Sequence, residues 1–159
     1  MDLLNLPAYP FRIREVEGRK QIFDIFRKKY VSLTPEEWVR QHFLVWLNKN
    51  LGYPAGLISV EASLKYNNLK KRADAIIYGK NGKALLIVEC KAPDVKLTQN
   101  AFDQLARYNF AFGVRHLLVT NGLNHYCCVR KDKGTDWVFL EEIPAFDNIN
   151  TDIYLPPSG

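Results

Sequence analysis

The strongest pattern in the chain is an apolar stripe at helical spacing over residues 35–50, which predicts an amphipathic helix. Thr34 can cap its start, Pro35 suits its first position, and Glu37 completes a capping box. Glu36 shares the apolar stripe, so we expect its carboxylate to point inward, whereas Glu37 is used by the cap. The stripe itself consists of Val39, Phe43, Trp46 and Leu47.

A period-two alternation over residues 58–66 predicts a half-exposed strand, and a basic turn is expected at 67–72. The next two runs, 73–78 and 84–89, are apolar on both faces, which indicates central strands of a sheet that helices cover on both sides. A helix capped by Thr98 follows at 99–112, and shorter strands are predicted at 117–120, 126–130 and 137–143.

The ends of the chain are less regular. Residues 5–10 resemble an extended arm, and alternations around Gly18 indicate a small hairpin or an irregular cover. We therefore expect an N-terminal arm and hairpin cover over 1–30, one folded domain over 31–145 and a loosely ordered tail over 146–159. A length of 159 residues, 47% of them hydrophobic, is enough for one core without disulfides or a structural metal.

Charge and cysteine usage narrow the picture only slightly. The chain has 22 Lys and Arg against 17 Asp and Glu, a net charge of +5 that suits a polyanionic partner but is common among ordinary proteins. Cys90 lies in an apolar run, and Cys127 and Cys128 would point to opposite faces of a strand, so no disulfide framework is implied. We interpret the histidines as structural because apolar residues surround them: His42, His116 and His125.

Targeting signals and membrane spans are not evident in the sequence. No basic stretch followed by an apolar run opens the chain, and no apolar segment reaches the length that a membrane helix needs. We therefore expect a cytoplasmic protein with no membrane contact.

The Asn81-Gly82 pair between the two apolar strands is a hairpin signal that sets a register. If it forms a two-residue turn, Lys80 faces Lys83, and counting back along both strands places Asp74 opposite Glu89. Directly opposed residues share a face of the sheet and lie roughly 5 Å apart. Two carboxylates would therefore meet on an otherwise apolar hairpin.

Such a carboxylate pair needs compensation, because like charges repel and a buried carboxylate resists ionisation. The two general solutions are a proton shared by the pair and a cation held between them, and Mg²⁺ takes one or two carboxylates together with waters and phosphate oxygens. Lys91, two residues beyond Glu89, adds a cation that can hold or deprotonate an attacking water. A lone Asp at the start of a strand, or a lone Glu-x-Lys, is usually an ordinary turn or surface group. Only the combination of Asp74 with Glu89 and Lys91 predicts a site.

Five phrases in this order resemble the PD-(D/E)xK nuclease superfamily. Within it, the chain is most similar to the nuclease domain at the N-terminus of the R subunit of type I restriction enzymes. The likeness spans about residues 28–142, and Ala73 stands where the superfamily name has a proline. The phrases begin at Thr34 (TPEEWVRQ), Arg72 (RAD), Val88 (VECKAP), Gln104 (QLARYN) and Thr120 (TNG).

This resemblance implies an α/β (α+β) fold with a restriction-endonuclease-like αβββαβ core, whose mixed central sheet is flanked by helices over 31–145. It also implies hydrolysis of DNA phosphodiester bonds with Mg²⁺ or Mn²⁺. Asp74, Glu89 and the Cys90 backbone carbonyl would bind the metal, and Lys91 would be the catalytic lysine. Gln104 and Tyr108 match a Gln-x-x-x-Tyr motif that assists the site or contacts DNA, and Glu36 is the preferred auxiliary carboxylate.

Basic residues near this site suit phosphate contact more than base reading. The chain lacks a Gly-x-x-x-x-Gly-Lys-Ser/Thr loop, so we expect no ATP-driven motor within it and leave room for a separate motor or specificity subunit and for a homodimer. The candidate DNA-binding residues are Lys70, Lys71, Arg72, Lys96 and Arg107.

Three functions remain open at this point. The first is a stand-alone Mg²⁺-dependent deoxyribonuclease, with endonuclease favoured over exonuclease. The second is a DNA-binding or scaffold subunit that keeps the nuclease fold and cuts only with a partner. The third is a carboxylate dyad acting on a substrate other than nucleic acid.

Overall fold

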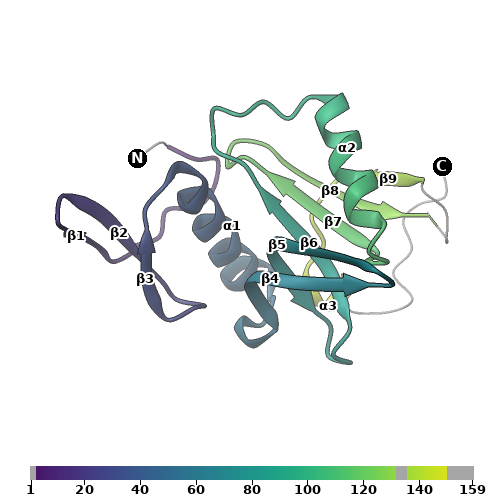
Figure 1. The fold of residues 1–159 in the computed structure, drawn as a ribbon, viewed down its shortest axis with the longest axis horizontal. Helices are drawn as coiled ribbons and strands as arrows, with labels where there is room; N and C mark the ends of the chain where they lie inside the picture. Colours follow the sequence, from purple (N-terminus) through teal and green to yellow (C-terminus); the bar gives the residue numbers. More distant parts are fainter. Residues whose placement is uncertain (1–2, 132–135, 150–159) are drawn as a thin grey trace.

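The computed structural model describes residues 3–131 and 136–149, which form two β-sheets and three α-helices (Figure 1). A short sheet comes first, with antiparallel strands β1 (Ile13–Val16), β2 (Arg19–Asp24) and β3 (Lys29–Ser32). The larger sheet has the order β4-β5-β6-β7-β8-β9, and only its β6 and β7 pair in parallel. Its strands are β4 (Ile58–Tyr66), β5 (Leu69–Tyr78), β6 (Ala84–Cys90), β7 (His116–Thr120), β8 (His125–Arg130) and β9 (Trp137–Leu140).

Helices cover both faces of this mixed sheet, as the apolar character of its central strands predicts. On one face, α1 (Pro35–Leu51) packs its Val39 and Phe43 against buried residues of β5 and β6. On the other face, α2 (Gln99–Phe110) packs its Phe102 and Ala106 against the same two strands and β7. The order α1, β4, β5, β6, α2, β7 confirms the expected αβββαβ core, and β8 and β9 extend it.

The start of α1 confirms the predicted cap and corrects one part of it. The Thr34 hydroxyl accepts the Glu37 backbone N–H at 3.0 Å, and Pro35 occupies the first turn. The predicted capping box is wrong, because the Glu37 carboxylate is buried and binds Arg27 and Arg40. Ion pairs with two guanidiniums are stronger than a hydrogen bond to one backbone N–H, so tertiary packing overrides the local motif.

The β5–β6 hairpin confirms the predicted register in its central part although its turn differs from the prediction. Only Gly82 of the predicted two-residue turn has a positive φ, whereas a type I′ turn needs one at both positions. The connection is longer, and a register shift between Ile77 and Tyr78 pairs Tyr78 with Ala84. This irregularity offsets the longer turn, so Ala75 still faces Val88 as the sequence predicts.

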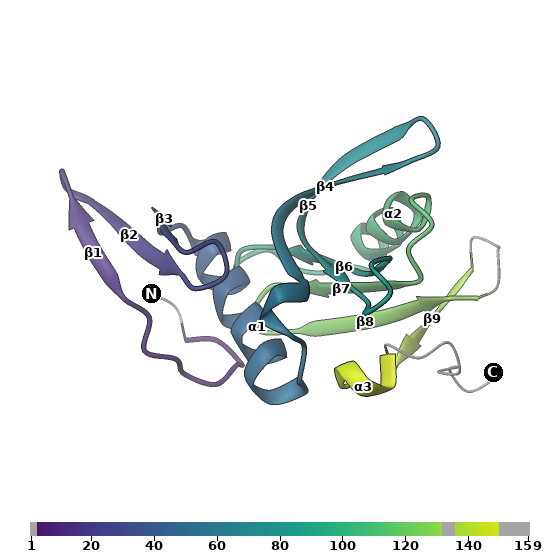
Figure 2. The same ribbon diagram turned by 90° about the horizontal axis from the view of Figure 1, so that it is seen from below.

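The β4–β5 hairpin differs more. The predicted strand at 58–66 is confirmed, but the predicted basic turn over 67–72 is wrong because β5 begins at Leu69. Lys70 and Lys71 are therefore paired strand residues, opposite Lys65 and Leu64. Figure 2 shows the outer part of this hairpin rising away from the rest of the sheet, on the side where α2 lies.

The remaining segments lie at the edges of the fold. The expected hairpin or irregular cover before residue 30 is the β1–β3 sheet, which lies beyond α1 from the larger sheet (Figure 1). The tail expected from residue 146 includes the short helix α3 (Phe146–Ile149). Its Phe146 ring packs against the Tyr53 ring, with 5.5 Å between the ring centres. The rest of that tail lies outside the described residues. Within the described part of the chain, no helix is long and apolar enough to cross a lipid bilayer.

Candidate active site

Two carboxylates come together near the carboxyl end of β6. Continuing the β5–β6 register by one pair from Ala75 and Val88 brings Asp74 opposite Glu89. Their side chains are 19% and 13% exposed, so both are largely withdrawn from water. Asp74 also accepts the Cys90 backbone N–H through Oδ2 at 2.7 Å, which fixes its carboxylate beside β6.

The protonation of Glu89 reflects this crowded setting. Burial raises the pKa of Glu89, the Lys71 ammonium counteracts this, and the neighbouring Asp74 charge raises the pKa further. The net direction is upward from the usual value, as expected for a carboxylate pair in a partly buried site. A further positive charge at the pair would favour the doubly ionised form.

Each carboxylate already has one cationic neighbour. The Lys71 ammonium donates hydrogen bonds to Glu89 and to the Asn109 side-chain carbonyl, and its side chain is 4% exposed. Arg40 reaches Asp74 Oδ1 from α1 at 3.4 Å. Lys71 therefore comes from β5, on the face of the sheet that α2 covers. Arg40 comes from α1, which covers the other face.

Arg40 is itself held by a buried ion-pair network. The Glu37 carboxylate accepts from Arg40 Nε at 3.0 Å and from Arg27 Nη2 at 2.8 Å. Arg27 follows β2 and also binds Asp24, which is 1% exposed. The two guanidiniums lower the pKa of Glu37 against the opposing effect of burial. The network thus connects the β1–β3 sheet through α1 to Asp74.

The sequence did not single out Arg40, although a signal for it exists. Arg40 directly follows Val39 of the apolar stripe and lies four residues before Leu44, another buried core residue of α1. A charged residue on the buried face of a helix needs a partner of opposite charge, and it is a candidate for a site.

Lys91 directly follows β6 and is half-buried, and its charge acts on Glu36 at the start of α1. The pKa of Glu36 is raised first by partial burial and then by the charge of Asp74, while Lys91 and Arg40 lower it. The charges of Asp74 and Lys91 are therefore close to Glu36. Glu36 is nevertheless exposed, so the prediction that it points inward is wrong, and Glu37 is the buried member of the pair. In α1, Glu37 faces Arg27 and Arg40 and pairs with both. Helical periodicity alone could not predict the pairing with Arg27, which lies outside the helix.

The helix α2 contributes three polar residues to this region. Tyr108 is 54% exposed, and the Lys71 ammonium lies 5.0 Å from its ring centre. Gln104 is exposed one turn earlier on the same helix. Asn109, which the sequence reasoning missed, is 1% exposed and accepts from Lys71. Its position seven residues after Phe102, on the buried stripe of α2, is the signal that could have found it.

The candidate DNA-binding residues separate into two kinds. Lys70, Lys96 and Arg107 are exposed, and exposed Arg72 pairs with Glu61 at 2.9 Å. Lys71 differs because it is buried on Glu89, so in this structure its charge serves the carboxylate pair.

Two carboxylates are the acidic donors that the site offers a divalent cation. Within residues 3–131 and 136–149, no group of three or more His, Cys, Asp or Glu side chains could hold a metal ion. Asp74 and Glu89 remain as a two-carboxylate set, and Mg²⁺ commonly takes one or two carboxylates with waters and substrate phosphates completing its shell. The residues therefore fit a hydrated Mg²⁺ or Mn²⁺ better than a metal enclosed by protein ligands. Burial raises the pKa of the Cys90 thiol well above its usual value, so its sulfur is a poor ligand.

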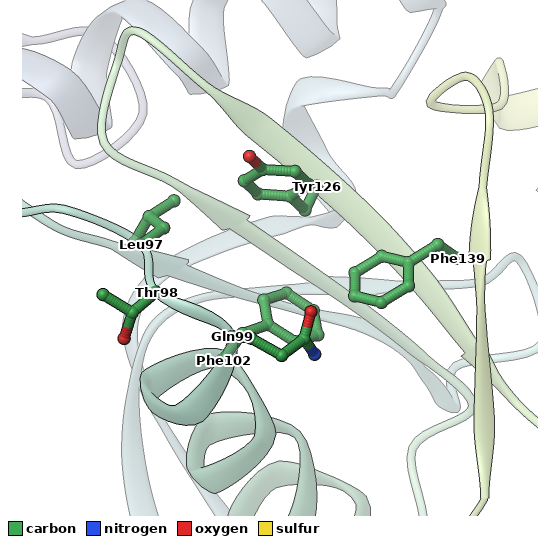
Figure 3. Close-up of a pocket in the computed structure, with 6 residues that line it drawn as sticks. All are labelled: Leu97, Thr98, Gln99, Phe102, Tyr126 and Phe139. Atoms are coloured by element: carbon green, nitrogen blue, oxygen red, sulfur yellow. The ribbon is translucent and has the colours of Figure 1, made fainter.

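A shallow aromatic pocket of about 80 Å³ lies beside the N-terminus of α2 (Figure 3). Tyr126 of this pocket pairs with Val119, and Val119 pairs on its other side with Glu89. The pocket is therefore two strands away from the carboxylate pair and separate from it. Its lining residues are Leu97, Thr98, Gln99, Phe102, Tyr126 and Phe139.

Comparisons with known proteins bear on this arrangement. A family model described as Type I restriction enzyme R protein N terminus matches residues 35–144, which include both carboxylates and Lys91. No curated protein matches the chain. Among solved structures, a candidate nuclease belonging to DUF820 from Anabaena variabilis ATCC 29413 matches with 11% identity and a TM-score of 0.47. That match covers 89% of this chain and 86% of the other.

Proposed function

Because the chain belongs to the family of the type I restriction enzyme R protein N terminus, we propose that it is a Mg²⁺-dependent deoxyribonuclease that hydrolyses phosphodiester bonds. The observation that carries the proposal is the pairing of Asp74 with Glu89 in a partly buried setting. Lys91 directly follows β6, and its charge acts on Glu36, as that of Asp74 does. Lys71 and Arg40 each contact one carboxylate, yet burial and the charge of Asp74 still raise the pKa of Glu89. A divalent metal that also binds a substrate phosphate would favour the doubly ionised pair.

In this proposal Asp74 and Glu89 hold Mg²⁺ or Mn²⁺, and the Cys90 backbone carbonyl supplies a further oxygen. When bound there, the metal would polarise the scissile phosphate and lower the pKa of a coordinated water. Lys91 holds the attacking water and offsets negative charge that develops on the phosphate. Glu36, next to the Lys91 charge, is the auxiliary carboxylate that orients this ammonium.

The surrounding residues position the carboxylates and the substrate. Arg40 orients Asp74 through the contact at Oδ1, and its own position depends on Glu37. Lys71 is the counter-ion of Glu89, so metal binding has to displace or share this contact.

The substrate side of the proposal uses the exposed residues. Tyr108 lies on α2 next to Lys71, and exposed Gln104 lies one turn earlier on the same helix, so both can contact a DNA strand. The remaining basic residues suit phosphates. The basic residues are Lys70, Arg72, Lys96 and Arg107. We propose endonuclease activity in the cytoplasm, by the chain alone, as a homodimer or with a separate motor or specificity subunit.

A cleavage panel tests this function. Duplex plasmid, linear duplex, single-stranded and branched DNA are incubated with the protein in Mg²⁺, in Mn²⁺ and in EDTA. We expect metal-dependent cleavage of at least one form, and Lys91→Ala should reduce its rate by about 100-fold or more while leaving the circular dichroism spectrum unchanged. Full activity in Lys91→Ala would show that the site is wrongly assigned.

The panel also separates the alternatives. Salt-sensitive DNA binding without cleavage in either metal would favour a DNA-binding subunit that depends on a partner for cleavage. If calorimetry detects neither Mg²⁺ nor Mn²⁺ binding, the carboxylates act as a proton-sharing dyad instead.

A further inference from the structure

The outward face of the β1–β3 sheet carries arginines and aromatic rings. Strand pairing places Arg14 opposite Gln21 and Phe23 opposite Tyr30, and residues two apart along a strand share a face. The opposite face carries Ile22 and Asp24, which are 0% and 1% exposed, so that face packs against the rest of the protein. The outward face, called here the arginine face, consists of Arg12, Arg14, Val16, Arg19, Gln21, Phe23, Tyr30 and Ser32.

Two of these arginines are held in place by aromatic rings. The Arg12 guanidinium carbon lies 4.0 Å from the centre of the Phe23 ring, and that of Arg14 lies 3.8 Å from the centre of the Tyr30 ring. Arg14 also donates from Nε to the Gln21 side-chain carbonyl at 2.8 Å. Stacking covers one side of a guanidinium and leaves N–H groups at its edge available. Side chains ordered in this way lose less entropy when they bind an anion.

Among residues 3–131 and 136–149, no carboxylate lies on the arginine face. The three acidic residues of this region lie elsewhere: Glu15 is on the opposite face, Glu17 is in the β1–β2 turn, and Asp24 is buried. Within the part of the chain that the structure describes, none of the face's three arginines forms an ion pair, in contrast to Arg27, Arg40 and Arg72. An exposed set of guanidiniums without ion pairs, two of them ordered by stacking, suits phosphate groups better than a protein surface of mixed charge.

We propose that the arginine face binds the phosphate backbone of DNA at a second contact, outside the candidate active site. The inference rests on the proposed function only in taking DNA as the polyanion. The contact carries no sequence information, since guanidinium–phosphate bonds position a duplex without reading its bases.

The ion-pair network gives this second contact a fixed relation to the candidate active site. Asp24 and Arg27 at the inner side of the β1–β3 sheet bind Glu37 and Arg40 of α1, and Arg40 contacts Asp74. DNA bound by the arginine face is therefore held on a sheet that side-chain ion pairs join to the helix next to Asp74.

The test measures DNA binding without catalysis. A fluorescently labelled duplex is titrated in EDTA at several salt concentrations with the wild-type protein and with the triple variant Arg12→Gln, Arg14→Gln, Arg19→Gln. The matched control is Lys49→Gln, Lys80→Gln, Lys83→Gln, which removes the same number of exposed positive charges from the last turn of α1 and from the β5–β6 turn. Thermal unfolding confirms that all three proteins are folded.

We expect the arginine variant to bind DNA about 10-fold or more weakly than wild type. Its plot of log affinity against log salt concentration should be shallower by about 2 to 3. The lysine control should differ little from wild type in either quantity. Equal losses in both variants would show that only net charge matters and would overturn the proposal. So would wild-type affinity in the arginine variant, or binding of the wild type to anionic phospholipid vesicles but not to DNA.

This outcome is independent of cleavage. If the wild type binds DNA through the arginine face but cuts no DNA in any metal, the binding proposal stands and the proposed nuclease activity fails. If Lys91→Ala abolishes cleavage and the arginine variant binds DNA normally, the proposed nuclease activity stands and the binding proposal fails.

Discussion

The substitution Glu37→Gln tests whether a buried ion-pair network holds the site together. Glu37 is 5% exposed and accepts from Arg27 Nη2 at 2.8 Å, from Arg40 Nε at 3.0 Å and from Gln41 Nε2 at 3.3 Å. Glutamine keeps the shape of the side chain but removes its charge and turns one acceptor into a donor that faces Arg40. Both guanidiniums would then be partly buried without full compensation.

The expected loss follows from removing one partner of a buried charge cluster, which costs about 3–5 kcal/mol. For a chain of 159 residues, each kcal/mol lowers Tm by roughly 2–4 °C, so the midpoint should fall by about 6–20 °C. The pKa of Glu37 is lowered in the fold from its usual 4.5, so its contribution is complete above pH 4.5 and is lost as the pH falls through the folded-state value. The difference in free energy of unfolding between wild type and Glu37→Gln should therefore decrease as the pH falls below 4.5.

The assays are thermal and denaturant unfolding followed by circular dichroism, from neutral pH to below pH 4. The control is Glu36→Gln on the same turn of α1, where the carboxylate is exposed and the expected change is within about 0.5 kcal/mol. If Glu37→Gln is as stable as Glu36→Gln at neutral pH, the network does not stabilise the fold and its link to Asp74 has no energetic basis.

Three further predictions concern separate parts of the fold. Gly113→Ala should lose about 1–3 kcal/mol, because Gly113 has φ +78° and a Cβ there would lie 2.8 Å from the Tyr66 ring; Gly56→Ala, which has open space, is the control in the same unfolding assay. Burial and Arg115 lower the pKa of His116 to about 4, so the protein should lose up to about 3 kcal/mol of stability as the pH falls from 6.5 to 4. His116→Gln should remove this pH dependence. A His116 imidazole whose NMR signals titrate near pH 6.5 would contradict the reasoning. Lys71→Met leaves Glu89 without its ammonium, so unfolding curves should show a loss of about 3 kcal/mol at pH 8. This loss should shrink as the pH falls and Glu89 becomes protonated, and an unchanged pH profile would refute the pairing.

Much of the candidate site could be predicted because its signals are local. The Thr34 cap and the apolar stripe that follows predicted α1, and two continuous apolar runs predicted the central strands. The opposition of Asp74 and Glu89 depended on a turn that differs from the prediction. It was preserved because the irregularity between Ile77 and Tyr78 offsets the longer connection.

The missed features depend on contacts between distant segments. Glu37 and Arg40 pair with Arg27, which no helical periodicity places beside them. Lys71 becomes buried because the β4–β5 hairpin approaches α2, where Asn109 accepts from its ammonium. Glu61 in this hairpin has φ 51°, a left-handed conformation that a glutamate gives no sequence signal for.

The most direct test of the carboxylate pair is the initial rate of DNA cleavage as a function of Mg²⁺ concentration, measured for wild type and for Asp74→Asn. Asparagine keeps an oxygen that can accept the Cys90 N–H but halves the charge of the pair. We expect a saturable rise of the wild-type rate with Mg²⁺ and a loss of about 100-fold or more in the variant. Cleavage that persists in EDTA, or a variant that cuts as fast as wild type, would contradict a metal-dependent nuclease built on Asp74 and Glu89.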